Sequence, residues 1–164
     1  MVTCTITPCR AAVRLNSGVR PHMRVRRFAA IVLLATCTGC TDYSSRISDQ
    51  FNAKARTSID LMKAVPITWD KVCILGPYSG DEEAEKILGF KWPVERRTSI
   101  EDSDGIALLL FVQNDSVVEY IEHPRDQGDF SMLDGQCFRS SNAKFRAVND
   151  SRKNWGHLVP ASEG

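Results

Sequence analysis

The sequence predicts one small α+β domain over residues 48–148, with two N-terminal helices packed on one face of a mainly antiparallel sheet of four or five strands. Two observations predict this class. Apolar residues recur at helical spacing in the first part of the domain, and short apolar runs separated by turn residues fill the second part. Helices that precede a series of hairpins are typical of α+β domains.

The first helix is expected over residues 48–65. Ser48 can serve as its N-cap and Pro66 stops it. Its apolar stripe, which either contacts the core or lines a ligand groove, consists of Phe51, Ala55, Ile59, Met62 and Val65.

A buried strand over residues 69–75 and a second helix are expected next. The second helix begins near Ser79, because Ser79 and Glu82 have the spacing of a capping box, and acidic residues follow where the helix dipole favours them. Gly89 ends this helix. Residues 90–104 show no clear period and are expected to be extended or looped.

The strongest strand patterns come after residue 105. Residues 106–112 and 117–121 should pair as an antiparallel hairpin. A second hairpin is expected from residues 130–133 and 136–139, and a last strand over 143–148. Residues 149–164 are expected to form a loosely held tail.

The charge of the chain is divided unevenly. The 164 residues have a formal net charge of +1. Residues 1–39 hold six arginines and no acidic residue, so 15 basic and 20 acidic residues remain from position 40 onward, a net charge of −5. Such an acidic body argues against nucleic acid as a partner, because phosphate binding needs a basic face. The balanced composition also excludes a disordered chain and a polytopic membrane protein.

Residues 1–39 have the pattern of a signal peptide. Three arginines between positions 24 and 27 precede an apolar run over residues 28–35, which is too short to span a bilayer. Small residues follow, up to Cys40. The pattern is best formed if translation starts at Met23, and the alternative is a genuine N-terminal extension.

The segment Leu34-Ala35-Thr36-Cys37-Thr38-Gly39-Cys40 behind this run resembles the signal peptide of a bacterial lipoprotein. In that class a peptidase cuts before a cysteine that carries diacylglycerol. The resemblance implies lipidation of Cys40 and a lipidated tether over residues 40–47. It implies nothing about the fold or function of the domain that follows. Cys37 stands where Leu is usual and is the alternative acceptor. The other alternative is an ordinary secretory peptide and a soluble periplasmic protein.

The resemblance also implies a location. The domain would face the periplasm from the bacterial cell envelope, bound to the membrane by its lipid. Thr41 stands where Asp would favour the inner membrane, so the outer membrane is slightly favoured. Several acyl chains would make this attachment effectively permanent.

Two cysteines remain after cleavage and lipidation, Cys73 and Cys137. Outside the cytoplasm an even pair is expected to form a disulfide. Two unpaired buried thiols are the alternative. No metal site or cofactor is expected, because from residue 40 onward Cys-x-x-Cys spacing is absent and only two histidines follow Cys40.

No catalytic motif is evident, and no catalytic residue is assigned. The titratable cluster that includes a histidine lies in a loop expected over residues 122–129, and it is a candidate contact loop. Its residues are Glu122, His123, Arg125 and Asp126.

Two functions follow as hypotheses. The first is a membrane-anchored, non-enzymatic domain that binds a partner such as another envelope protein. The second is a periplasmic hydrolase that uses the His123 loop, with the histidine as general base. A His123 bonded to a carboxylate and to a Ser or Thr inside a pocket would favour the hydrolase.

Overall fold

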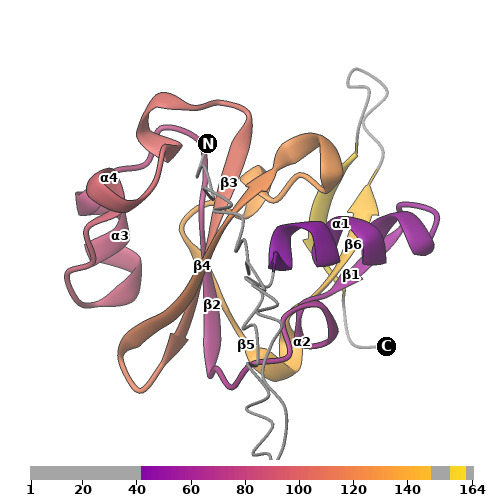
Figure 1. Ribbon diagram of the computed structural model, residues 1–164, viewed down its shortest axis with the longest axis horizontal. Coiled ribbons are helices and arrows are strands. Elements are labelled where there is room, and N and C mark those ends of the chain that lie inside the picture. Colours follow the sequence, from indigo (N-terminus) through magenta and orange to yellow (C-terminus); the bar gives the residue numbers. More distant parts are fainter. Residues whose placement is uncertain (1–41, 149–155, 162–164) are drawn as a thin grey trace, which may run out of the picture. The chain divides into compact units, whose positions relative to one another are not determined.

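The computed structural model describes residues 42–148 and 156–161 (Figure 1). All the described residues belong to one compact unit. The expected signal peptide and Cys40 lie outside them. The helices are α1 (Tyr43–Ala53), α2 (Leu61–Ala64), α3 (Asp81–Leu88) and α4 (Val94–Arg97), with 3-10 turns η1 (Ile100–Asp102), η2 (Arg125–Gln127), η3 (Ser131–Leu133) and η4 (Ser140–Asn142). The strands are β1 (Ser58–Asp60), β2 (Lys71–Leu75), β3 (Ile106–Gln113), β4 (Ser116–Pro124), β5 (Gln136–Arg139), β6 (Lys144–Val148) and β7 (His157–Pro160).

A four-stranded antiparallel sheet has the order β4-β3-β2-β5. The predicted hairpin is confirmed as β3 and β4, whose two-residue loop places Asn114 and Asp115 at φ 47° and 55°. Positive φ at both loop positions matches the twist of the flanking strands. The Asn114 N–H donates to the carboxylate of Asp70 at 2.9 Å. Strand β3 is buried from Ala107 to Val112 because both faces of the sheet are covered.

A second antiparallel sheet has the order β1-β6-β7. The α+β class and the antiparallel pairing are therefore confirmed, but the strands form two sheets where one was expected. The expected tail is corrected in part, since β7 pairs with β6 and Leu158 is fully buried. The remaining tail residues, 149–155 and 162–164, lie outside the described residues.

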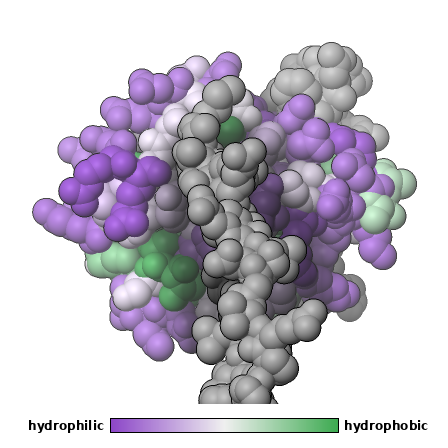
Figure 2. All heavy atoms as spheres, viewed as in Figure 1, coloured by the Kyte–Doolittle hydropathy of each residue, from purple (hydrophilic) through white to green (hydrophobic). Residues whose placement is uncertain are grey.

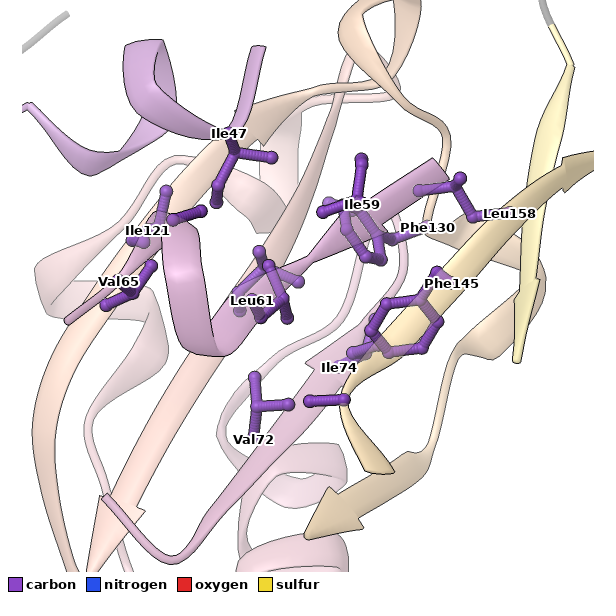
Figure 3. Close-up of a cluster of buried hydrophobic side chains, with 14 of the residues drawn as sticks. Ile47, Ile59, Leu61, Val65, Val72, Ile74, Ile121, Phe130, Phe145 and Leu158 are labelled. Atoms are coloured by element: carbon purple, nitrogen blue, oxygen red, sulfur yellow. The ribbon is translucent and has the colours of Figure 1, made fainter. Parts of the chain in front are cut away.

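The four-stranded sheet separates two apolar cores. Val72 and Ile74 point to the core that contains α1, α2 and the second sheet, whereas Cys73 and Leu75 point to the core under α3 and α4. Figure 3 shows side chains from α1, β1, β2, β6 and β7 converging in the first core. The expected placement of both N-terminal helices on one face is wrong, because alternation along β2 gives each face its own apolar surface.

The first helix is shorter than predicted and begins earlier. It ends at Ala53, after which Ala55 and Arg56 adopt φ 50° and 60° and the Arg56 N–H donates to the carbonyl of Phe51. Ile59 then enters β1 and is buried beside Phe145 of β6. The spacing of Ile59 fits a helix and a strand alike, and pairing with β6 decides between them.

The expected tether over residues 40–47 also needs correction. Residues 43–47 belong to α1, and Ile47 is fully buried. Asp42 caps the helix through its carboxylate, which accepts the N–H of Ser45 at 3.2 Å. Burial of Ile47 ties the first turn of α1 to the domain.

The second predicted helix is α3, shifted by one residue at its start. Gly80 is the N-cap, and its N–H donates to the carboxylate of Glu83 at 2.9 Å. Ser79 instead donates its hydroxyl to the carbonyl of Gly76 at 2.8 Å. Gly89 ends the helix at φ 82°, a conformation that glycine adopts without strain.

The predicted second hairpin is wrong in its first half. Residues 131–133 form the 3-10 turn η3, and β5 pairs with β2 instead. Phe130, which was expected in a strand, is fully buried against Phe145, with ring centroids 5.3 Å apart. Within the described residues, no helix is long and apolar enough to cross a membrane.

Candidate functional site

His123 lies at the end of β4, opposite Ala107 of β3. The expected loop begins only at Arg125, and the side chain of His123 is fully buried. It points to the same core as Ile121, two residues earlier, and its ring meets Phe130 edge to face at 5.6 Å. A strand that continues through His123 explains the difference from the sequence prediction, because alternation turns this residue inward.

Both ring nitrogens of His123 have partners. Nε2 lies 3.3 Å from the carbonyl oxygen of Gln127, which can only accept, so Nε2 carries the proton. Nδ1 is then the acceptor for the hydroxyl of Ser44, 3.2 Å away. Burial lowers the pKa of His123 to about 4, although the Gln127 carbonyl and the charges of Asp126 and Asp42 act in the opposite direction. The ring is therefore neutral at pH 7.

A neutral imidazole that accepts a serine hydroxyl is also the pair that activates a nucleophile in hydrolases. In those sites a third group, commonly a carboxylate, orients the histidine, and the serine faces the substrate. Here the third group is the main-chain carbonyl of Gln127. Ser44 and His123 do not line the hollow at the end of β4. Its lining consists of Asp104, Gly105, Arg125 and Asp126.

Gly128 closes the turn that holds the Gln127 carbonyl against His123. Its φ is +133°, and a Cβ atom at this position would lie 2.9 Å from Cδ1 of Ile59. Such a conformation and such a close approach both require glycine. The turn after β4 is therefore packed directly against β1.

Arg125 binds Asp129, four residues along the chain. Its Nε and Nη2 atoms donate to the two carboxylate oxygens at 3.0 and 3.1 Å, while Nη1 donates to the carbonyl of Asp104 at 2.7 Å. Burial would raise the pKa of Asp129, but the hydrogen bonds from Arg125 and Ser131 outweigh it and lower that pKa. The bond to Asp129 is the main cause that raises the pKa of Arg125. Both groups are charged at neutral pH.

The other two residues of the predicted contact loop differ in exposure. Glu122 belongs to β4, and its carboxylate accepts the N–H and the hydroxyl of Ser99. Asp126 is exposed, and its carbonyl accepts a hydrogen bond from Arg56. The four candidates do lie together, but the side chains of three of them, Glu122, His123 and Arg125, bind other parts of the domain.

Three loops meet at one end of the four-stranded sheet, because β2 ends, β3 begins and β4 ends there. Tyr78, Asp104, Gly105, Arg125 and Asp126 come from these loops and are called the Tyr78 surface below. The last four line a hollow of 420 Å³. The charge of Tyr78 is among the causes that raise the pKa of Arg125, and it is the smallest of them.

Tyr78 has a strained backbone and an exposed side chain. Its φ is 65°, and its side chain is 64% exposed. For a bulky residue, positive φ is an outlier that costs roughly 1–2 kcal/mol and is often found at functional sites. The N–H of Tyr78 donates to the carbonyl of Ile100 at 2.9 Å, which holds the loop in place.

Few large apolar side chains are exposed elsewhere. The face seen in Figure 2 is mainly hydrophilic, with its largest hydrophobic group left of centre. Met132 of η3 is 60% exposed, and η3 lies beside the Tyr78 loop because the N–H of Gly76 donates to the carboxylate of Asp134 at 2.7 Å. The other exposed large apolar residues of the described chain are Met62 and Val118.

A second hollow, of 500 Å³, lies at the opposite end of the sheet beside the β3–β4 hairpin. Its two basic residues, Lys71 and Arg139, are matched by two acidic residues, Asp70 and Asp115. Asp70 is already used to hold the hairpin. This hollow has no surplus charge that would select a ligand.

Cys73 and Cys137 are joined as a disulfide, with sulfur atoms 2.01 Å apart and Cα atoms 4.0 Å apart. They face each other on β2 and β5. The Ser140 N–H donates to the carbonyl of Asp70, so the cysteines are a non-hydrogen-bonded pair, in which side chains approach closely. Cys73 is buried and Cys137 is exposed on the edge strand.

Among residues 42–148 and 156–161, no three His, Cys, Asp or Glu side chains group as a metal site requires. Several acidic residues do lie near one another in the α3–η1 region. Glu95 is the main cause that raises the pKa of Glu101, with smaller effects from Asp102 and Asp81.

Sequence reasoning missed two residues of this region, since Ser44 was assigned to the tether and Asp129 to a loop. It placed Tyr78 beside the turn before a helix but did not predict its positive φ. A tyrosine gives no sequence signal of positive φ, unlike Gly or Asn. The Arg125-x-x-x-Asp129 spacing is visible in the sequence, but it usually indicates a pair on a helix.

The chain was compared with protein-family models, with curated proteins and with solved structures, and no match was found in any of the three.

Proposed function

We propose that this chain is a lipid-anchored protein of the bacterial cell envelope whose domain faces the periplasm and binds another envelope protein. The outer membrane is the slightly favoured location. The lipoprotein-like segment that ends at Cys40 supports the anchor, and Asp42 caps α1 only two residues later. Two residues span at most about 7 Å, so a lipid on Cys40 would hold the domain directly at the bilayer.

The disulfide supports the compartment. Cross-strand pairs such as Cys73–Cys137 persist in oxidising compartments, including the periplasm, and are rare in the cytosol. Only Cys40 of the cysteines from position 40 onward then remains for lipid attachment. This division of cysteines agrees with the lipoprotein resemblance.

The Tyr78 surface is the proposed binding surface. Tyrosine and arginine are enriched among residues that dominate binding energy, and this surface contains an exposed tyrosine, Tyr78, and an arginine, Arg125. Arg125 is held rigid by Asp129, so little conformational entropy would be lost there on binding. A tyrosine kept in a strained backbone conformation supports a role in binding more than one in folding.

Lipid attachment is tested by metabolic labelling with an alkyne-tagged palmitate. Cys40→Ser should abolish labelling, and Cys37→Ser, the matched control three residues earlier, should keep it. Labelling lost only in Cys37→Ser would move the acceptor to Cys37. Labelling unchanged in both variants would rule out lipid attachment at this pair.

Binding is tested by photo-crosslinking in intact cells. A photoreactive amino acid at Tyr78 should give a discrete crosslinked product, whereas the same group at Val118, an exposed residue of β4, should not. A product from both positions, or from neither, would argue against the Tyr78 surface.

The hydrolase remains a second candidate, favoured by the contact between Ser44 Oγ and His123 Nδ1. A serine activated in this way reacts with fluorophosphonate probes. Modification of Ser44, absent in His123→Gln, would support the hydrolase. We expect Ser44 to remain unmodified, because His123 is fully buried and its second nitrogen is bonded to a carbonyl.

A further inference from the structure

Five exposed basic side chains belong to or flank α1, α2, β1 and β6, and we call this set the basic face: Lys54, Arg56, Lys63, Lys144 and Arg146. The exposed acidic residues of the same elements are Asp42 and Asp49. The register pairs Asp60 with Lys144 and Ser58 with Arg146, and alternation turns both β6 side chains away from buried Phe145. Asp60 also lies 3.5 Å from the Lys63 ammonium group.

The layer that packs on the other face of the four-stranded sheet carries a net negative charge. Residues 81–104, which include α3, α4 and η1, hold eight acidic and four basic residues. Figure 1 shows α3 and α4 on one side of the sheet and α1, β1 and β6 on the other. The net charge of −5 from residue 40 onward is thus unevenly distributed, and the domain has an electric dipole across its layers.

Helix α1 connects the proposed anchor to the basic face. Its N-terminus lies two residues from Cys40, and Lys54 is its C-cap. Eleven residues of α-helix span about 16 Å. At the anchored end, the guanidinium of Arg46 lies 5.9 Å from the ring centroid of Tyr43. Tyrosine and arginine of this kind are suited to the headgroup region of a bilayer.

We infer that the basic face lies against anionic lipid headgroups, with α1 along the membrane surface and the acidic α3–η1 layer turned away, an orientation that rests on the proposed lipid anchor. A negatively charged membrane attracts lysine and arginine within about a Debye length and repels carboxylates. An anchor at one end of α1 leaves the domain free to rotate. The dipole selects the rotation in which the basic residues meet the lipid.

Lysine footprinting tests this orientation. The full lipidated chain is reconstituted in vesicles of phosphatidylcholine alone or with 30% phosphatidylglycerol, and modified with an amine-reactive reagent. Lys54 and Lys144 should react about threefold more slowly with the anionic lipid present, and about 1 M salt should remove the difference. Lys86 and Lys91 of the acidic layer, both exposed, are the internal controls. Equal reactivity of Lys54 and Lys144 in the two vesicles would overturn the inference.

Charge reversal provides matched variants. Lys144→Glu with Arg146→Glu should abolish the protection of Lys54, whereas Lys86→Glu with Lys91→Glu should leave it intact. Loss of protection in both double variants would indicate an effect of net charge alone and would contradict a specific face.

Flotation separates this inference from the anchor. A chain that floats with phosphatidylcholine vesicles but shows no lysine protection keeps the anchor and loses the orientation. If the chain does not float, the full-length Cys40→Ser chain is sedimented with phosphatidylglycerol vesicles at low salt. Binding that Lys144→Glu with Arg146→Glu abolishes would retain the basic face without the anchor, and unchanged binding would reject it.

Discussion

The hydroxyl oxygen of Ser44 lies 3.2 Å from Nδ1 of His123, and this contact joins the first turn of α1 to the end of β4. Ser44 follows Cys40 by four residues in the sequence. His123 also binds the turn that contains Arg125 and Asp126, through the carbonyl of Gln127. The proposed anchor and part of the proposed binding surface are therefore connected through one buried side chain.

Stability should fall in mild acid because of His123. Its pKa is about 4 in the folded chain and about 6.5 when unfolded. Above pH 6.5 the ring is neutral in both states and its contribution is complete. As the pH falls from 6.5 to 4, the unfolded state takes up a proton that the folded state does not, and the free energy of unfolding should drop by roughly 3 kcal/mol. Urea unfolding at several pH values measures this, and His123→Gln should remove most of the slope.

Ser44→Ala should destabilise the domain by about 1–3 kcal/mol, because it leaves a buried ring nitrogen without a donor. Ser45→Ala is the matched control. It removes an exposed hydroxyl that donates to Asp42, and should cost less than about 1 kcal/mol. Urea midpoints give both values. Equal losses of stability in the two variants would show that the buried Ser44–His123 contact contributes no more than an exposed hydrogen bond.

Asp129→Ala should cost about 3–5 kcal/mol, since it leaves Arg125 with an unpaired charge and removes the acceptor of the Ser131 N–H. Lys63→Ala breaks a 3.5 Å pair with Asp60 whose lysine is exposed to solvent, and should cost at most about 1 kcal/mol. Thermal unfolding at pH 7 compares the two variants. A loss for Asp129→Ala as small as that for Lys63→Ala would contradict a structural role for the Arg125–Asp129 pair.

Opening the disulfide should lower the free energy of unfolding by about 4 kcal/mol, since the bond closes a loop with a sequence separation of 64 residues. Cys137→Ala tests this without placing a change in the core, because Cys137 is exposed. Peptide mapping under non-reducing conditions should recover Cys73 linked to Cys137. Free thiols in protein isolated from cells would contradict the oxidised pair.

Tyr78→Gly should preserve stability or raise it by up to about 1 kcal/mol, while removing the product expected from a photoreactive amino acid at Asp126, an exposed residue of the same Tyr78 surface. Glycine relieves the positive φ but enlarges the conformational freedom of the unfolded chain, so the two effects partly cancel. Calorimetry measures the stability. A loss above about 2 kcal/mol would show that the Tyr78 side chain supports the fold.

Local patterns predicted much of the fold. The apolar runs of β3 and β4 are separated by turn residues, and α3 has acids at its start and Gly89 at its end, so both could be located from neighbouring residues. The boundary between α1 and β1 could not be located from neighbouring residues. Ile59 satisfies helical and strand spacing, and only its partner Phe145, far along the chain, selects the strand.

The candidate site shows the same limit. Pro124, Arg125 and Asp126 are turn-forming or polar residues, and they suggested a loop that included His123. Pairing with Ala107 extends β4 and buries the histidine, which is a long-range effect. The strain at Tyr78 depends on contacts such as that with the Ile100 carbonyl, for which its neighbours in the sequence carry no signal.

The mass of the intact protein extracted from cell membranes tests the lipid anchor most directly. We predict a chain that begins at Cys40, carries acyl chains on that residue, and is two hydrogen masses lighter than its reduced form because of the Cys73–Cys137 bond. A mature chain without acyl groups, or one that begins at a residue other than Cys40, would contradict the anchor.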